Sequence, residues 1–262
     1  MNHIAPQTAQ AMSVDAVQWQ ARVDLAAAHR IAFREGLHEG IFNHLTARVP
    51  GTTDRYLQIP FGTHWSEVTA SCFMEVAFDG TVQKGEGFVE DSAYGIHAPI
   101  HAKIPEAEAV FHTHMPFASA LCRLEDPRIK PIGQTELRLM RTVAYDADYQ
   151  GPAFDESEGN RMVSLLEANP GTNIVFMANH GVLTLGSIAQ AYDLLYYTER
   201  VAQVQLYAMW TGQPLKHLPQ DVIEASEKVW SRNKRYGEKN NAEHHFDALK
   251  RLLDRKDPDY RD

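Results

Sequence analysis

The sequence holds 13 histidines among 262 residues, and His112 and His114 are separated by a single threonine. They fall in AVFHTH (residues 109–114), a mainly apolar run that predicts a buried strand. Residues i and i+2 of a strand share one face, so both imidazoles point the same way. Neutral imidazole binds Zn²⁺ and related divalent ions, which makes a metal the simplest partner for such a pair. Surface histidines or hydrogen-bonded core histidines are the alternative.

A third histidine strengthens the metal interpretation. His180 follows the apolar run IVFM (residues 174–177) and lies in a predicted turn, Asn179-His180-Gly181. Three histidines and a water form an open site, which is typical of catalytic rather than structural metals. His97 and His101 are spaced i, i+4 on one face of a predicted helix and are candidate ligands or neighbours of the ligands. A polar helix face is the alternative for His101.

The elements that must position these residues alternate between helix and strand. Apolar spacing and turn signals predict helices at about 13–37, 91–103, 157–168 and 187–209, a helix opened by Pro116, and a charged helical part from about Leu218. Strands are expected in 45–50, 55–60, 73–78 and 109–114, and on both sides of the 179–181 turn. We therefore predict one α/β domain over residues 1–215 and a C-terminal helical extension over 216–262.

Composition excludes several classes of function. The 25 Lys and Arg against 34 Asp and Glu give a net charge of −9, which argues against a nucleic-acid surface or an anionic membrane as partner. Two cysteines form no disulfide framework and favour a cytoplasmic location. The N-terminal MNHIAPQTAQAMS lacks the features of a signal peptide, and no apolar stretch is long enough to span a membrane. A small molecule is the expected partner.

Four segments together resemble the class II aldolase/adducin family: NHLTARVPG (43–51), YLQIPFGT (56–63), VFHTHMP (110–116) and NHGVLTLG (179–186). Their order and spacing match over roughly residues 20–215. The family includes zinc-dependent sugar-phosphate aldolases such as L-fuculose-phosphate aldolase, epimerases, metal-dependent decarboxylases and the head domain of adducin. The resemblance implies a three-layer α/β/α sandwich with a central, mostly antiparallel sheet. It also implies homotetramers with sites at subunit boundaries.

The resemblance also assigns the metal ligands. His112, His114 and His180 take the places of the family's three metal-binding histidines, which implies one divalent metal per chain. Zn²⁺ is preferred, with Mn²⁺, Fe²⁺ or Co²⁺ as alternatives, because imidazole accepts all four ions. The family's acid/base glutamate is replaced by Ala93. Glu90 and Asp91 lie just upstream and reach the metal only through a rearranged loop. His97, one helical turn downstream, is therefore preferred as the substitute base or as a group that contacts the metal ligands.

The family's phosphate pocket is also altered. Its asparagine, glycine and two serines correspond here to His44, Gly62, and Asp91 with Ser92. A carboxylate at this place repels a dianion, whereas His44 can pair with a single carboxylate or hydroxyl. Thr63 is a further candidate for contact with substrate. Tyr145, in a stretch that resembles adducin-type members, is a candidate site residue, with packing on the sheet as the alternative.

These residues predict a divalent-metal-dependent lyase. It cleaves a carbon–carbon bond, in aldolase or decarboxylase fashion, through a metal-stabilised enolate of a small unphosphorylated hydroxy- or oxo-acid. The residue that handles the proton decides between these reactions. Two alternatives remain. A non-catalytic adducin-like binding module is favoured by the missing glutamate and opposed by the intact histidines, and an oxygenase would use iron held by three histidines.

Overall fold

The structure is a computed structural model that describes residues 13–151, 155–230 and 235–262. The N-terminal stretch in which we expect no signal peptide lies outside these ranges, except for Ser13. The helices are α1 (Val14–Arg34), α2 (Asp91–Lys103), α3 (Pro116–Leu121), α4 (Gln134–Leu139), α5 (Ser157–Ala168), α6 (Ile188–Trp210), α7 (Gln220–Trp230) and α8 (Asn241–Lys256). The strands are β1 (His44–Arg48), β2 (Arg55–Gln58), β3 (Met74–Ala77), β4 (Val82–Lys84), β5 (Ala109–Thr113), β6 (Val143–Asp146), β7 (Ile174–Met177), β8 (Val182–Gly186), β9 (Arg235–Tyr236) and β10 (Lys239–Asn240).

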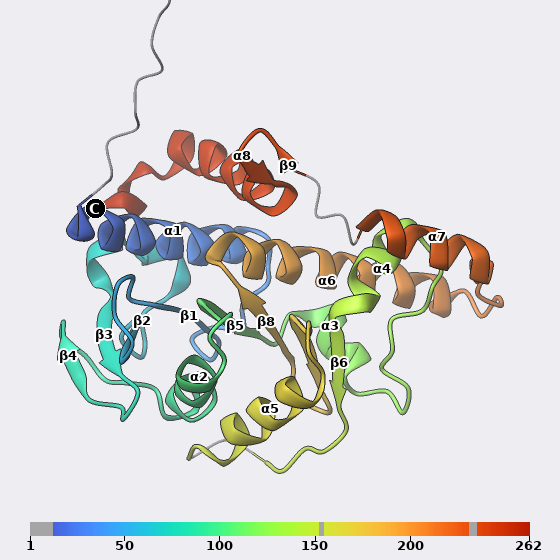
Figure 1. Cartoon of the computed structure of the whole chain (residues 1–262), viewed down its shortest axis with the longest axis horizontal. Helices are drawn as coiled ribbons and strands as arrows, with labels where there is room; N and C mark the ends of the chain where they lie inside the picture. Colours follow the sequence, from blue (N-terminus) through green and yellow to red (C-terminus); the bar gives the residue numbers. More distant parts are fainter. Residues whose placement is uncertain (1–12, 152–154, 231–234) are drawn as a thin grey trace, which may run out of the picture.

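Eight strands form one central sheet in the order β4-β3-β2-β1-β5-β8-β7-β6 (Figure 1). Every neighbouring pair in this sheet is antiparallel except β6 and β7. The predicted mostly antiparallel sheet is therefore confirmed. Strands β1 and β5 lie side by side near its middle, and their register places His44 opposite His112. Two histidines that are far apart in sequence thus share one face of the sheet.

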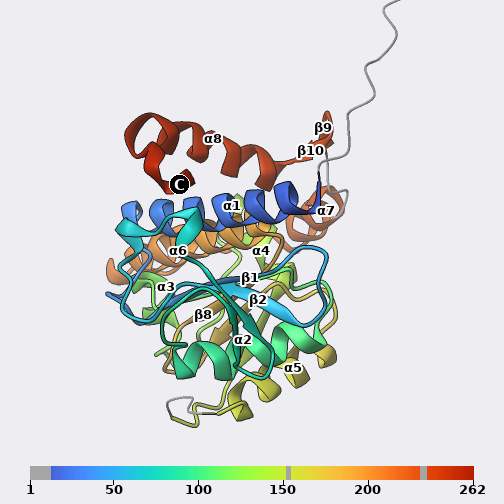
Figure 2. The ribbon, with the colours of Figure 1, turned by 90° about the vertical axis from the view of Figure 1, so that its left-hand side faces the viewer.

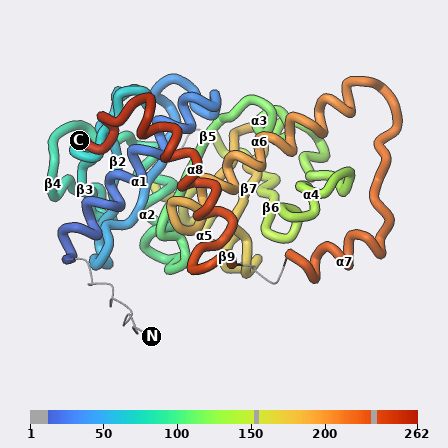
Figure 3. Tube along the Cα trace, turned by 90° about the horizontal axis from the view of Figure 1, so that it is seen from above, coloured from blue at the N-terminus to red at the C-terminus, as the bar shows by residue number. Residues whose placement is uncertain are grey.

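Helices cover both faces of the sheet, which confirms the predicted α/β/α sandwich (Figure 2). Helices α1 and α6 pack on one face, where four alanines, Val23, Leu25 and Ile31 of α1 enter the larger buried core. Helices α2 and α5 pack on the other, over a smaller core of aliphatic side chains from β5, β7 and β8. Helix α8 lies across α1 and α6 as a further layer, and α7 packs against α4 (Figure 3).

Local signals explain most of these elements. Helices α2 and α5 begin and end at the residues predicted. Ser13 caps α1 by accepting a hydrogen bond from the Ala16 N–H, and Pro116 is the first residue of α3. Helix α1 ends at Arg34, before the predicted end near Leu37, because the chain turns through Gly36 in a left-handed conformation.

Several short elements were not predicted from the sequence: α4, β4, β6 and the β9–β10 hairpin. Each of these strands has at most four residues and each lies at a sheet edge or in a two-stranded hairpin. Too few residues are present for a periodic pattern to emerge. Among the described residues, none of the helices combines the length and apolarity needed to cross a bilayer.

Two glycines allow α2 and α5 to approach closely. A Cβ at Gly159 would lie 2.3 Å from the carbonyl oxygen of Gly95, and a Cβ at Gly95 would lie 2.4 Å from the carbonyl oxygen of Asp155. Backbone atoms cannot move away as a flexible side chain can. The sequence therefore requires glycine at both positions, and this contact fixes the start of α2 against α5.

We expect Gly159→Ala to lower the free energy of unfolding by about 1–3 kcal/mol, because the new methyl group overpacks the contact between helices. Urea denaturation measures the change. Ser164→Ala, on the exposed side of the same helix, is the matched control and should change stability by less than about 0.5 kcal/mol. A Gly159→Ala protein as stable as the control would show that the two helices are not fixed against each other.

Candidate metal centre

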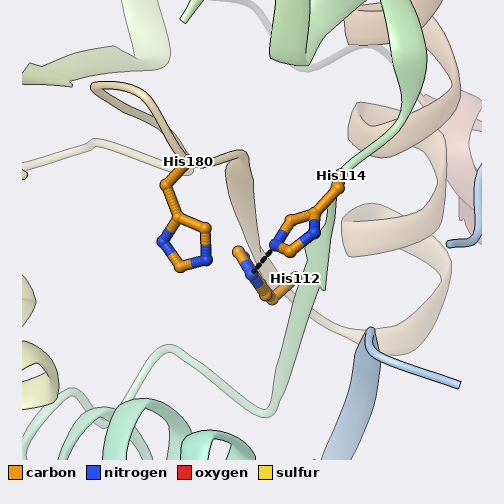
Figure 4. Close-up of side chains that lie close together, drawn as sticks. All are labelled: His112, His114 and His180. Atoms are coloured by element: carbon orange, nitrogen blue, oxygen red, sulfur yellow. Dashed lines mark hydrogen bonds between the residues drawn. The ribbon is translucent and has the colours of Figure 1, made fainter. Parts of the chain in front are cut away.

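Three histidines from two parts of the chain converge at one end of the sheet (Figure 4). His112 lies on β5, His114 directly follows it, and His180 lies in the turn between β7 and β8. One ring nitrogen from each lies within 4.8 Å of the other two. The ring centroids of each pair are 4.7–4.9 Å apart. The structure thus brings together the residues predicted as metal ligands.

The turn that carries His180 depends on its neighbours. Asn179 adopts φ 55°, a left-handed conformation that asparagine tolerates better than most residues. A Cβ at Gly181 would lie 2.5 Å from the Thr113 carbonyl oxygen and 2.8 Å from the His114 ring. Only glycine lets the turn lie this close to the end of β5. Asn179 and Gly181 therefore allow the backbone conformation that places His180 beside the other two histidines.

The Nδ1 atom of each histidine faces an oxygen. That of His112 donates a hydrogen bond to the Val182 carbonyl at 3.1 Å, and that of His114 donates to the Glu39 carboxylate. That of His180 lies 3.4 Å from Glu158 Oε1. Such contacts fix the tautomer and the orientation of metal-binding histidines. With Nδ1 as the hydrogen-bond donor, the neutral rings of His112 and His114 keep their lone pairs on Nε2.

The Nε2 atoms of His112 and His114 then face each other at only 3.1 Å. Two lone pairs at this distance repel unless a proton or a cation lies between them. Tetrahedral zinc with Zn–N bonds of about 2.0–2.1 Å separates its nitrogen ligands by about 3.3 Å, close to this spacing. Burial, reinforced by the neighbouring imidazoles, lowers the pKa of His112 well below its ordinary value, and burial also lowers the pKa of His114. Both rings are therefore neutral at neutral pH and suited to a divalent metal.

A cavity of about 560 Å³ opens in front of the three histidines. Its walls carry four of the eight residues predicted to bind substrate or to handle protons, and several that were not predicted. The lining comprises Glu39, Phe42, His44, Phe61, Val89, Glu90, Asp91, Ser92, His112, His114, Arg123, Tyr149, Asn179 and His180. Gly62 and Thr63 line a small adjoining hollow that also touches His44 and Glu90.

Glu90 is occupied by hydrogen bonds. It caps α2 by accepting from the Ala93 N–H at 2.6 Å, and it accepts from the Ser92 hydroxyl at 2.7 Å. Its carboxylate also pairs with His44 Nε2 at 2.9 Å. Burial opposes ionisation, but these contacts outweigh it and lower the pKa of Glu90 to about 2. Glu90 is thus a charged cap and a poor proton acceptor.

His97 lies behind the cavity wall, not in it. Its side chain is fully buried; Nε2 lies 3.4 Å from His44 Nδ1, and Nδ1 lies 2.7 Å from the Thr46 hydroxyl. Thr46 in turn contacts His101, whose Nδ1 donates to the Ala107 carbonyl. Burial lowers the pKa of His97 well below its ordinary value and that of His101 to about 3. His97 can influence the cavity only through His44.

The two tyrosines of the 143–151 stretch have different positions. The Tyr145 hydroxyl accepts a hydrogen bond from the Ile129 N–H at 3.0 Å, and its ring packs on Phe176. Burial raises its pKa. Tyr145 is absent from the cavity lining, whereas the Tyr149 ring lies 6.0 Å from that of His180 and lines the cavity. The catalytic role of Tyr145 therefore stays a prediction, and the residue does not line the cavity.

Sequence reasoning missed the charged residues that surround the histidines. Glu39 and Glu158 orient His114 and His180, and Arg123 lines the cavity. None of the three belongs to a motif. Glu39 lies 75 residues from His114 along the chain, so only the folded structure pairs them. A charged residue in the turn after α1 or at the end of α3 gives no signal in a single sequence.

A family model described as Class II Aldolase and Adducin N-terminal domain matches residues 23–206. A Pseudomonas aeruginosa protein whose name places it with class 2 aldolase proteins is 32% identical over 262 residues, covering 99% of this chain and 98% of that protein. The crystal structure of an aldolase II superfamily protein from Pseudomonas syringae is 34% identical, with a TM-score of 0.85 and coverage of 94% and 96%. L-fuculose 1-phosphate aldolase from Glaciozyma antarctica PI12 is 25% identical, with a TM-score of 0.80 and coverage of 99% and 97%. The resemblance identified from the four sequence segments is confirmed.

We expect the parent protein to bind one Zn²⁺ per chain, and His112→Ala and His180→Ala to reduce the metal content to background. Glu158→Gln should raise the Kd for Zn²⁺ by about 10–100-fold, because it weakens the contact that orients His180. Elemental mass spectrometry and titration calorimetry on tag-free protein measure these effects. His217→Ala, at an exposed histidine far along the chain, is the control. Equal metal content in parent and His112→Ala would contradict the assigned site.

The contacts of Glu90 predict a pH-dependent contribution to stability. Its folded pKa of about 2 lies below the ordinary value of about 4.3, so its stabilisation is fully present above about pH 5 and is lost as the pH falls towards 2. We expect Glu90→Gln to lower the free energy of unfolding by about 1–2 kcal/mol near neutral pH.

Urea denaturation at several pH values should show this difference shrink as the solution is acidified. Glu86→Gln, at an exposed glutamate of the same loop, should show no such trend. A difference for Glu90→Gln that is constant from about pH 6 to about pH 3 would contradict a charged cap.

Proposed function

The chain belongs to the class II aldolase and adducin family, and from this we propose that it is a divalent-metal-dependent lyase. Its reaction is the cleavage of a carbon–carbon bond in a small unphosphorylated hydroxy- or oxo-acid. The observation that supports this most directly is the pair of Nε2 lone pairs of His112 and His114 facing each other at 3.1 Å, with His180 beside them. This donor set suits an ion with an open coordination position that faces the cavity.

A divalent metal held by His112, His114 and His180 would supply a Lewis acid that stabilises an enolate as the carbon–carbon bond breaks. The chain's own residues prepare the site for this chemistry. Glu39 and Glu158 hold the imidazoles in position from behind. His44 stacks on His112 with ring centroids 5.4 Å apart and closes the wall towards α2. The substrate is thereby confined to the open side of the three histidines.

Asp91 is the residue that we propose to handle the proton. It lines the cavity as the first residue of α2, and its carboxylate makes no hydrogen bond or ion pair with the described residues. Glu90, by contrast, already accepts from three donors, and His97 has no exposed surface. A general acid or base must reach the reacting group directly or through one water. Asp91 meets this requirement better than Glu90 or His97.

The charges of the cavity favour an unphosphorylated substrate. Three carboxylates line it, on Glu39, Glu90 and Asp91, against a single arginine, Arg123. Asp91 and Ser92 stand at two of the positions that bind the phosphate in sugar-phosphate aldolases, and the Ser92 hydroxyl donates to the neighbouring Glu90 carboxylate. A phosphate dianion would be repelled there.

One observation favours the second candidate, an adducin-like binding module without catalysis. The position of the acid/base glutamate is occupied by Ala93, which is fully buried and whose N–H is bound to Glu90. A module of this kind has no need of a metal. The metal content and the enolate chemistry described below therefore separate the two functions, and iron in place of zinc would direct attention to the oxygenase alternative.

The proposal includes Zn²⁺ as the preferred ion, a homotetramer and a cytoplasmic location. The tetramer is supported by the family resemblance. The location is supported by Cys72 and Cys122, which are both free thiols. For Cys122, burial raises the pKa to about 12, so this thiol is unreactive and is no candidate nucleophile.

The Zn²⁺-loaded protein should catalyse exchange of the methyl protons of pyruvate with D₂O, because exchange reports enolate formation without the full reaction. Asp91→Asn should slow the exchange by about 100–1000-fold while the protein still binds Zn²⁺. His112→Ala should abolish both the exchange and the binding of Zn²⁺. Proton NMR measures the exchange.

Asp221→Asn, at an exposed aspartate of α7, is the matched control and should exchange like the parent. A panel of 4-hydroxy-2-oxo acids, with the released pyruvate detected by lactate dehydrogenase, tests cleavage directly. Zn²⁺-loaded protein that neither exchanges pyruvate nor cleaves any member of the panel would contradict the lyase and favour the binding module.

A further inference from the structure

Arg123 and the aromatic side chains of the cavity have no role in the function proposed so far. We infer that they select the substrate: a monocarboxylic hydroxy- or oxo-acid whose carboxylate binds Arg123 and whose body is an apolar group of the size of an aromatic ring. This inference rests on the proposed function, since it describes the substrate of the same site. It narrows the substrate class from any small acid to an aryl-substituted one.

Arg123 is held where a carboxylate would lie beside the metal centre. Its Nη1 donates to the Ser119 carbonyl at 2.7 Å and to the His180 carbonyl at 3.3 Å. The second contact ties the guanidinium to the peptide of a metal-ligating residue. Arg123 is also the one Lys or Arg among the described residues that line the cavity. Arg123 is therefore the side chain that can pair with a substrate carboxylate in this cavity. A guanidinium suits this role because its planar N–H groups match the two carboxylate oxygens.

Aromatic rings form much of the rest of the cavity wall. Phe42 and Phe61 are 58% and 45% exposed, and Tyr149 is 46% exposed. The Phe61 N–H donates to the Phe88 carbonyl at 2.9 Å, which fixes the loop that carries its ring. Large apolar side chains exposed together in a concave site favour a ligand that covers them. A substrate as small as pyruvate would leave these rings in water.

The negative charges of the cavity restrict the substrate to one carboxylate. Glu39 is paired with His114 and Glu90 with His44, but Asp91 has no partner among the described residues. A second anionic group on the substrate would approach one of these carboxylates instead of a cation. The cavity volume of about 560 Å³ is within the range of sites for ligands larger than a three-carbon acid. An aryl hydroxy- or oxo-acid satisfies the charge, the apolar wall and the size together.

Titration calorimetry of the Zn²⁺-loaded protein with benzoylformate, pyruvate and 2-phosphoglycolate tests this inference. Benzoylformate should bind at least about tenfold more tightly than pyruvate, because its ring covers Phe42 and Phe61. The phosphate compound should bind most weakly. Arg123→Gln should weaken benzoylformate and pyruvate equally, by about 10–100-fold, and Arg123→Lys should restore part of the loss. Phe61→Ala should remove the preference for benzoylformate and leave pyruvate unchanged.

Two variants serve as matched controls. Phe88→Ala removes a phenylalanine that is 81% exposed and is not part of the cavity lining, and Arg128→Gln removes an exposed arginine outside it. Both should bind like the parent. Thermal unfolding and light scattering on every variant show whether folding and subunit number are unchanged. If Phe42→Ala or Phe61→Ala dissociates an oligomer, the aromatic rings form a subunit contact and the inference is overturned.

Equal affinity for benzoylformate and pyruvate, or tightest binding of 2-phosphoglycolate, would also overturn it. Titration calorimetry measures binding without turnover, so its result does not depend on whether the protein is a lyase. If pyruvate exchange occurs but the aromatic preference is absent, only the substrate class is wrong. If the binding pattern holds but the protein neither exchanges pyruvate nor cleaves any of the 4-hydroxy-2-oxo acids, the lyase is wrong and the cavity is a binding site for aryl acids.

Discussion

The orientation of three imidazole rings is the constraint on which the rest of the site depends. Each ring has an oxygen at Nδ1: a strand carbonyl for His112, and the carboxylates of Glu39 and Glu158 for His114 and His180. The rings of His112 and His114, fixed by hydrogen bonds at Nδ1, present Nε2 to each other, and a cation between them would relieve the repulsion of their lone pairs. The fold must therefore hold five residues from four segments in place: Glu39, His112 with His114, Glu158 and His180. The antiparallel pairing of β5 with β8 and the tight 179–181 turn accomplish much of this.

The start of α2 determines how this site differs from that of sugar-phosphate aldolases. Glu90 serves as the cap of the helix and forms an ion pair with His44, while Ala93 occupies the position of the acid/base glutamate. His97, Thr46 and His101 continue the polar contacts behind the sheet. The two neighbouring carboxylates thus differ in role: that of Glu90 caps the helix, and that of Asp91 faces the cavity. We therefore propose that a few side chains at the start of α2, on the fold shared with the family, set the chemistry of this site.

The sequence was sufficient for the long elements and for identifying the three histidines that the fold brings together. Helices α2 and α5 begin and end at the predicted residues, and His112 and His114 lie on or directly after an apolar strand whose period places them on one face. The short edge strand β6 has too few residues for a pattern. Glu39, Glu158 and Arg123 could not be found, because their partners lie far away along the chain. The helical spacing of His97 was identified correctly, but spacing alone does not show that His44 stands between it and the cavity.

X-ray absorption spectroscopy at the zinc edge of the reconstituted protein tests the central claim most directly. Three orienting contacts predict a site with three imidazole nitrogens at about 2.0–2.1 Å and a remaining position filled by an oxygen from water. Addition of an oxo-acid should change only the oxygen part of the spectrum. A site with sulfur ligands, with fewer than three imidazoles, or without response to any oxo-acid would contradict a catalytic centre built by His112, His114 and His180.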